Sequence, residues 1–302
     1  MSSLPALLTP EFMASLDRLD VRSRKMLRGT VQGERRSKKR GASVEFADYR
    51  NYVEGDDLRR IDWNLYARLD KLFLRLFMEE EDLSVSLVLD VSGSMDYGDP
   101  NKLVYAKQMV AALGYVALTH HNRLNLYSFS DTVLDQRVGR RGRRPIPEMV
   151  EFLNRQAPGG AGATAGDLSG ALKRLSSVQR HPGIVVVVSD FFDKGDLSEA
   201  FKYLAGSKYD GYAVQLLSPQ EVDPAKGGVV GDLNLADMED GDKAQVSVSG
   251  ALLKKYAANL EAYCQHVKAM CTRRGLMYLA ATTDVPVERV VLQYLRERGL
   301  LG

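Results

Sequence analysis

The chain has 302 residues, of which 45% are apolar and 26% charged, and its 41 basic and 39 acidic residues leave a net charge of +2. This composition excludes a disordered or fibrous protein and fits a globular chain with a sizeable core, and the near-neutral charge requires no nucleic-acid or membrane partner. No run of about 18 apolar residues occurs, and the opening residues lack the features of a signal peptide, so we expect neither a secreted nor a membrane-spanning protein.

The N-terminal residues predict a short helix. Residues 10–28 place Phe12 and Leu16 at helical spacing, and Thr9 suits the position before the first turn. Further on, residues 72–78 (LFLRLFM) are apolar on both faces and predict a strand. We expect this strand to join the main sheet beside residues 84–90, antiparallel to them, with Trp63 buried against the edge of the sheet.

From residue 84 onward, predicted strands and helices alternate, and the runs at 84–90 and 184–190 are apolar almost throughout. This pattern is typical of a doubly wound, mainly parallel α/β sheet covered by helices on both faces. The predicted strands are 84–90, 123–129, 132–138, 184–190, 211–217 and 276–281. The predicted helices are 101–119, 146–155, 167–179, 196–205, 250–274 and 286–298.

The chain is expected to divide at residue 83. Residues 1–83 form an N-terminal extension that packs on the core, and residues 84–302 form the α/β domain. Residues 218–248 interrupt the alternation with Gly- and Asp-rich sequence and two weak strand patterns, and we interpret them as a small hairpin insertion.

Polar side chains follow the two buried strands. Asp90 ends the first and is followed by Ser92 and Ser94, and Asp190 ends the second. Ligands of open α/β sheets bind outside the carboxyl ends of the strands, and carboxylate and hydroxyl oxygens suit a hard cation such as Mg²⁺. Thr164, in the Gly-rich loop 158–164, can add a hydroxyl. The competing interpretation is a simple turn in which Asp90 and Ser92 bond only the backbone.

These residues resemble the metal-ion-dependent adhesion site of von Willebrand factor A domains, where an Asp-x-Ser-x-Ser loop, a threonine and a later aspartate hold Mg²⁺ or Mn²⁺. The resemblance implies a von Willebrand factor A-like core and a metal site. It carries over directly to Asp90, Ser92, Ser94 and Asp190. It carries over less directly to Thr164, which stands farther before the Ala171-Leu172 pair than the family pattern has it.

The segment upstream is similar to a second family. Glu45-Phe46, Arg50-Asn51-Tyr52, the stretch GDDLRRIDW at 55–63, Ala67-Arg68 and Glu79–Glu81 resemble the domain-of-unknown-function-58 family, which has a von Willebrand factor A-like core. The resemblance covers about residues 30–220. It implies an adaptor or chaperone-linked role beside MoxR-type AAA+ ATPases. GDDLRRIDW itself is interpreted as structural, with aspartates that cap helices and with Ile61 and Trp63 packed inside.

Enzyme motifs are missing from the sequence. It contains neither a G-x-x-x-x-G-K-S/T nor a G-x-S-x-G motif, and the four histidines have no metal-ligand or triad spacing. A phosphatase of the Asp-x-Asp type needs a carboxylate where Ser92 stands. We therefore expect a binding protein and not an enzyme. A Mg²⁺-dependent phosphoester hydrolase using Asp90 and Asp190 stays open as one alternative.

Two basic clusters, residues 18–40 and the arginine-rich loop 137–144, supply positive charge of the kind that phosphate binding needs. Neither interleaves aromatic side chains for base stacking, so a solvated or partner-facing surface is the favoured interpretation. A nucleic-acid-binding protein using the loop 137–144 is the second alternative.

The favoured partner is another protein. An ion held by hydroxyls and two acids keeps exchangeable waters, which a carboxylate from a partner can replace. We therefore expect a metal-dependent protein-binding protein whose partner, a MoxR-type AAA+ ATPase, supplies that carboxylate. The loop 137–144 is expected to flank the same surface and to steer the encounter with the partner.

The two cysteines indicate where the protein works. Cys264 and Cys271 stand seven positions apart in a predicted helix, beyond disulfide reach, which favours a reducing, cytoplasmic location.

Overall fold

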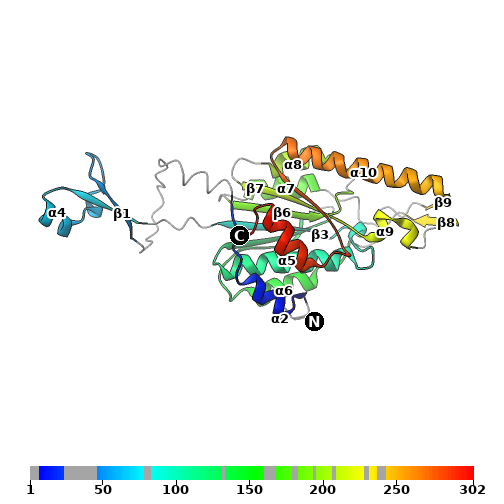
Figure 1. Ribbon diagram of the computed structural model, residues 1–302, viewed down its shortest axis with the longest axis horizontal. Helices are drawn as coiled ribbons and strands as arrows, with labels where there is room; N and C mark the ends of the chain where they lie inside the picture. The colour runs from blue at the N-terminus through cyan, green and yellow to red at the C-terminus, as the bar shows by residue number, and fades with distance from the viewer. Residues whose placement is uncertain are drawn as a thin grey trace. The chain divides into compact units, whose positions relative to one another are not determined.

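The computed structural model consists of two compact units (Figure 1). Residues 1–31 and 83–302 belong to one, here called the core unit, and residues 32–82 belong to the other, the small unit. The structure describes residues 7–23, 46–77, 83–130, 133–159, 168–178, 183–192, 195–205, 209–227, 231–236 and 243–302.

The core unit is built on a six-stranded sheet with the strand order β10–β7–β6–β3–β4–β5. Every neighbouring pair is parallel except β4 and β5, which are antiparallel. The chain starts in the centre, moves outward to one edge and then returns to build the other half. This is a doubly wound α/β sheet, so the predicted fold class is confirmed. The strands are β3 (Ser84–Asp90), β4 (Arg123–Phe129), β5 (Val133–Arg140), β6 (Gly183–Ser189), β7 (Tyr209–Leu217) and β10 (Met277–Thr282).

Helices cover both faces of this sheet, as Figure 1 shows. One face packs against α2 (Pro10–Leu16), α5 (Lys102–Thr119), α6 (Ile146–Arg155) and the last helix, which begins as α11 (Val287–Arg289) and widens into the π-helical segment η4 (Val290–Leu295). The other face packs against α7 (Leu168–Val178), α8 (Leu197–Leu204) and α10 (Gly250–Arg273). Helix α5 is buried along most of its length, because α2, α6 and η4 surround it.

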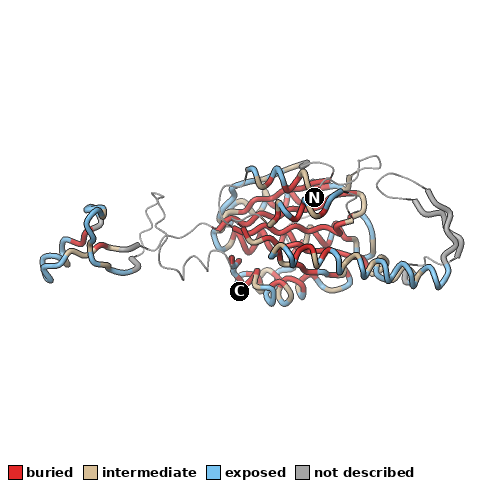
Figure 2. The backbone as a smooth tube through the Cα atoms, turned by 90° about the horizontal axis from the view of Figure 1, so that it is seen from above, coloured by how far each residue is buried: buried red, intermediate tan, exposed pale blue. Residues whose placement is uncertain are grey.

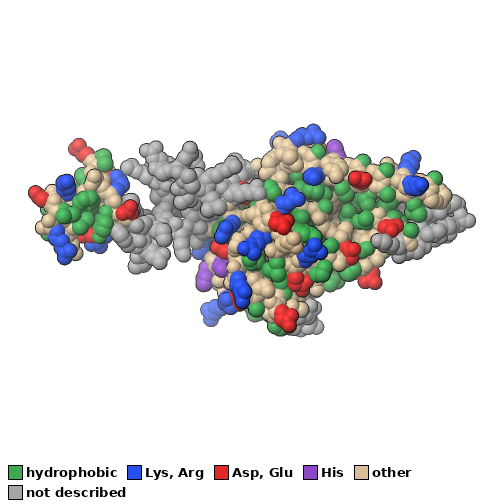
Figure 3. All heavy atoms as spheres, in the orientation of Figure 1, with side chains coloured by type: hydrophobic (Ala, Val, Ile, Leu, Met, Phe, Trp, Pro, Cys, Tyr) green, Lys and Arg blue, Asp and Glu red, His purple; other side chains and the backbone are tan. Residues whose placement is uncertain are grey.

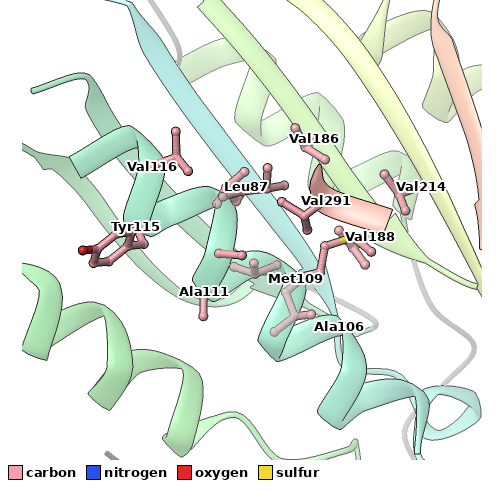
Figure 4. Packing of buried hydrophobic residues seen from close by; sticks show 14 of the residues in the cluster. Leu87, Ala106, Met109, Ala111, Tyr115, Val116, Val186, Val188, Val214 and Val291 are labelled. Atoms are coloured by element: carbon pink, nitrogen blue, oxygen red, sulfur yellow. The ribbon is translucent and has the colours of Figure 1, made fainter. Parts of the chain in front are cut away.

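The apolar strand residues alternate between two cores. Leu87, Val186 and Val214 point toward Met109 of α5 and Val291 of η4, as Figure 4 shows. Their sequence neighbours on the strands pack on the opposite side, against α7 and α8. Figure 2 shows the result as a continuous buried centre in which the strands are covered on both faces. A strand buried on both faces must be apolar at almost every position, which explains the uninterrupted runs in the sequence.

The N-terminal helix α2 belongs to this core. Thr9 caps it as predicted, its hydroxyl accepting a hydrogen bond from the Phe12 N–H at 3.2 Å. Phe12 and Leu16 are buried in the cluster that contains α5. The segment then pairs with residues 300–302, since the N–H groups of Asp20 and Gly302 each donate to the carbonyl of the other. The structure thus places residues 7–23 with the core unit and not with the segment that follows them in the chain.

A small hairpin interrupts the α/β alternation, as predicted. It consists of β8 (Gly231–Ala236) and β9 (Lys243–Val248), which pair antiparallel. Before it come α9 (Pro219–Val222) and the short 3₁₀ helix η3 (Pro224–Gly227). Within the described ranges, no helix combines the length and apolar character that crossing a bilayer requires.

The small unit has its own two-stranded antiparallel sheet, formed by β1 (Phe46–Asn51) and β2 (Phe73–Phe77), with the 3₁₀ helix η1 (Leu58–Arg60) and helix α4 (Trp63–Leu69) between them. The prediction that residues 72–78 join the main sheet beside 84–90 is wrong. Both edges of β3 are already hydrogen-bonded, to β4 on one side and to β6 on the other, so no position beside it is open.

The stretch GDDLRRIDW mainly caps helices, as its structural interpretation predicts. Asp57 caps η1, and Asp62 caps α4 while also accepting hydrogen bonds from the Tyr49 hydroxyl and from Arg75 Nε. The burial predicted for Trp63 is wrong: the residue is 60% exposed, and its ring touches Tyr66 edge-on. A two-stranded sheet with one short helix has too little interior to enclose an indole, and Figure 3 shows hydrophobic side chains on the surface of this unit.

Candidate functional site

The candidate site lies at the carboxyl ends of β3 and β6, the two central strands. These strands are direct neighbours, and the chain continues from β3 toward one edge of the sheet and from β6 toward the other. Ligands of doubly wound proteins bind at such a reversal, because the connections diverge there and leave an opening. Asp90 is the last residue of β3, and Asp190 follows the last residue of β6.

Asp90 is a buried carboxylate held by two hydrogen bonds. One oxygen accepts from the Ser92 N–H at 2.8 Å, and the other accepts from the Ser189 hydroxyl at 2.5 Å. Burial, and after it the neighbouring carboxylate of Asp190, raise the pKa of Asp90 to about 7. The two carboxylates therefore lie close enough to repel each other. A cation between them would relieve that repulsion.

Ser92 and Ser94 add two hydroxyl oxygens next to Asp90. Ser92 directly precedes the 3₁₀ turn η2 (Gly93–Met95), and Ser94 lies within it. Their Oγ atoms are 3.1 Å apart. Met95, fully buried, anchors the turn to the core. Alternate residues of a tight turn thus present their hydroxyls to one point, beside the carboxylate that the turn follows.

Asp190 is fixed on three sides. Its Oδ1 accepts a hydrogen bond from the Phe192 N–H at 3.0 Å, its Oδ2 contacts Lys102 Nζ at 2.7 Å, and its carbonyl accepts from the Gln215 amide at 2.9 Å. Phe191, next in the chain, adopts a left-handed backbone with φ of 59°, an uncommon conformation for a residue other than glycine. Its ring is buried against Phe201, which holds the turn in place.

Lys102 is the functional candidate that the sequence did not reveal. It is the first residue of α5, its side chain is 0% exposed, and its ammonium also contacts Glu221 Oε1 of α9 at 2.5 Å. Burial lowers the pKa of this lysine, but the carboxylates of Asp190 and Glu221 raise it by more, so the side chain stays charged at neutral pH. A lysine in the first turn of a helix normally points to solvent, so no local pattern distinguishes this one.

The structure therefore brings together Asp90, Ser92 and Ser94, with Asp190 on the adjoining strand end. Thr164 lies outside the described residues. The donors are hard oxygens, which fits Mg²⁺ or Mn²⁺ in chemical character. In the part of the chain that the structure describes, no group of three or more His, Cys, Asp or Glu side chains is arranged to hold a metal. An ion at this site would depend on hydroxyl oxygens and water as well as on the two carboxylates.

The arginine-rich loop does not flank this site, and that prediction is wrong. Strand β5 is antiparallel to β4 and runs away from the carboxyl edge, so that Arg140 pairs with Leu124. Phe129, which pairs with Asp90, is five residues farther along β4, about 16 Å at 3.3 Å per residue. Arginines of this loop are also engaged within the chain: Arg137 forms an ion pair with Asp135 at 2.8 Å, Arg140 forms one with Glu148 at 2.6 Å, and Arg143 forms one with Asp17 at 3.1 Å.

The sheet order and the polar groups at its reversal define the class: a doubly wound α/β protein with a cluster of carboxylates and hydroxyls at the switch point. The chain belongs to the family described as protein of unknown function DUF58, whose model matches residues 48–266. The family resemblance seen in the sequence is thereby confirmed.

Relatives with curated sequences are similar to almost the whole chain. The uncharacterized proteins Rv1480 of Mycobacterium tuberculosis and Mb1516 of Mycobacterium bovis are each 27% identical over 299 residues, which is 97% of this chain and 92% of theirs.

Among solved structures, the conserved hypothetical protein BatB from Bacteroides thetaiotaomicron is similar over 71% of this chain and 98% of its own, with 13% identity and a TM-score of 0.44. A von Willebrand factor type A protein from Catenulispora acidiphila is similar over 76% of this chain and 43% of its own, with 13% identity and a TM-score of 0.39.

Proposed function

We propose that this protein binds another protein through a divalent metal ion held at the ends of β3 and β6. Asp90, Ser92, Ser94 and Asp190 would hold Mg²⁺ or Mn²⁺, with Thr164 as a further hydroxyl ligand. The observation that carries the proposal is the position of two hydroxyls, 3.1 Å apart, beside a buried pair of carboxylates at the switch point of the sheet. These hard oxygen donors suit both ions, and the water ligands that such an ion retains can be exchanged.

The chain's own residues keep this site suited to binding. Asp90 and Asp190 each accept a hydrogen bond from a backbone N–H two residues ahead, so the turns that follow both strands are rigid. A preorganised site loses little entropy when it binds, which favours recognition of a partner's carboxylate at the open position of the ion.

We further propose that the partner is a MoxR-type AAA+ ATPase and that the complex forms in the cytoplasm. The partner follows from the family resemblance, which implies an adaptor or chaperone-linked role. The location follows from Cys264 and Cys271, which are both free thiols.

Binding of Mn²⁺, measured by electron paramagnetic resonance of the free ion, tests the metal site. Wild type is expected to bind one ion per chain, and Ser92→Ala/Ser94→Ala and Asp90→Ala to lose that binding while keeping the circular dichroism of the fold. Asp96→Ala is the matched control, because Asp96 is an exposed acid in the same loop that contacts Asn101 and not the site. Equal Mn²⁺ affinity in all four proteins would refute the metal site.

Binding to a purified MoxR-type ATPase from the same organism tests the partner. The complex is expected to weaken in EDTA and in Ser92→Ala/Ser94→Ala, because both remove the bridging ion. An affinity of the complex that EDTA does not change would exclude a metal bridge. Magnesium-dependent turnover of p-nitrophenyl phosphate that is lost in Asp90→Ala would instead favour the phosphoester hydrolase alternative.

A further inference from the structure

A buried lysine adjoins the carboxylates of the candidate metal site. Lys102 Nζ lies 2.7 Å from Asp190 Oδ2 and 2.5 Å from Glu221 Oε1, and its side chain is fully enclosed. The ring of Phe192 lies 5.6 Å from the ammonium and adds a favourable cation–π contact. Three segments of the chain meet at this one group: the start of α5, the end of β6 and helix α9.

The geometry holds the positive charge firmly against Asp190. Glu221 cannot easily move away, because its second oxygen closes the capping box of α9 by accepting hydrogen bonds from the N–H and the hydroxyl of Ser218. Asp190 is likewise held by the Phe192 N–H. The lysine therefore neutralises part of the charge that Asp190 would offer to any other cation.

We propose that Lys102 is a built-in cation that keeps the affinity of the Asp90–Asp190 site for free divalent metal low. This inference rests on the proposed metal site. A metal ion at Asp190 would share that carboxylate with an ammonium and would be repelled by it, and the low dielectric of a buried site strengthens both effects. The free protein would then bind Mg²⁺ weakly. The carboxylate of a partner would supply the missing negative charge, so that metal and partner bind together.

Two substitutions in the same cluster should change metal affinity in opposite directions. Lys102→Met keeps most of the side-chain volume, removes the competing charge and is expected to tighten Mn²⁺ binding about tenfold or more. Glu221→Gln leaves the lysine with Asp190 as its one carboxylate contact among the described residues and is expected to weaken Mn²⁺ binding. A merely structural role predicts otherwise, because loss of packing loosens the site and weakens binding in both variants.

The experiment is an Mn²⁺ titration of the full chain, followed by electron paramagnetic resonance, with circular dichroism to confirm folding. Lys107→Met is the matched control: Lys107 lies on the same helix and is half-buried, but its ammonium bonds to the Gln156 carbonyl at 2.6 Å and not to a carboxylate. It changes the net charge of the protein by the same amount as Lys102→Met. Its Mn²⁺ affinity is expected to equal that of wild type.

Lys102→Met leaves the buried carboxylate of Asp190 and the partly buried carboxylate of Glu221 without their cation and can fail to fold for that reason. The double variant Lys102→Met/Glu221→Gln removes the cation together with one carboxylate, and it too is expected to bind Mn²⁺ more tightly than wild type. Unchanged or weaker binding in the folded variants that lack Lys102, with normal binding in wild type, overturns the role of Lys102 and leaves the metal site standing. Failure of wild type and every variant to bind Mn²⁺ overturns both.

Discussion

Helix α2 can be tested as part of the core by removing one side chain. Leu16 is fully buried against the elements around α5. Leu16→Ala removes about three buried methylene equivalents, worth about 2.4 kcal/mol at roughly 0.8 kcal/mol each. The cavity left behind adds to this loss, so the free energy of unfolding of the core unit is expected to fall by about 3–4 kcal/mol.

Urea unfolding followed by far-UV circular dichroism measures this change, because most helices and strands belong to the core unit. Tryptophan fluorescence does not measure it, since the chain has one tryptophan and Trp63 lies in the small unit. Arg18→Ala, an exposed change just after the same helix, is the control and is expected to alter stability by less than about 0.5 kcal/mol. A loss below about 1 kcal/mol in Leu16→Ala would mean that α2 is not part of the core.

Three further predictions concern single positions. Trp63→Ala is expected to lower the free energy of unfolding by less than about 1 kcal/mol. The wild-type indole is expected to emit at long wavelength and to be readily quenched by acrylamide, and a blue-shifted emission protected from acrylamide would contradict its exposure. The hydrogen bond from Arg75 holds the pKa of Asp62 well below its usual range, so its contribution to stability is present at neutral pH and is lost as the pH falls below about 4. The single indole N–H resonance should report this acid transition of the small unit, and Asp62→Asn should no longer show it. Gly183→Ala on β6 would place a Cβ 1.9 Å from the Ser84 carbonyl oxygen and is expected to destabilise the sheet by about 3 kcal/mol or more in thermal unfolding, whereas Gly250→Ala meets open space and should not.

Local patterns in the sequence predicted the core unit well. The predicted bounds of β4 and α6 coincide with the observed ones. Each element is apolar on the sides that it buries, and this apolar pattern stops where the element ends. The same patterns do not encode which strands pair. Residues 72–78 have the composition of a sheet strand, and only the occupied edges of β3 reveal that they pair elsewhere.

The candidate site was predicted in its local part and missed in its long-range part. Asp90, Ser92 and Ser94 are neighbours in the chain, so their spacing shows the turn that gathers them. Lys102 reaches Glu221 across 119 positions, and the contact depends on the sheet order that brings α9 to the end of β6. The position of the arginine-rich loop likewise depends on the antiparallel register between β4 and β5, which the local sequence pattern does not predict.

Residues 7–23, which pair with residues 300–302, belong to the core unit, and this decides which shortened forms of the chain can fold. The side chain of Asp20 lies 3.4 Å from that of Asn122. The residue after Asn122 is Arg123, and its N–H donates a hydrogen bond to the carbonyl of Leu83 at 2.9 Å. Asp20 and Leu83 therefore lie near adjacent residues of the core unit although residues 21–82 separate them in the chain, which is the arrangement of a host domain that carries an insertion. Replacing residues 24–82 with a short flexible linker should yield a core unit that folds alone, whereas a shortened chain beginning at residue 84 would lack α2 and the pairing with residues 300–302.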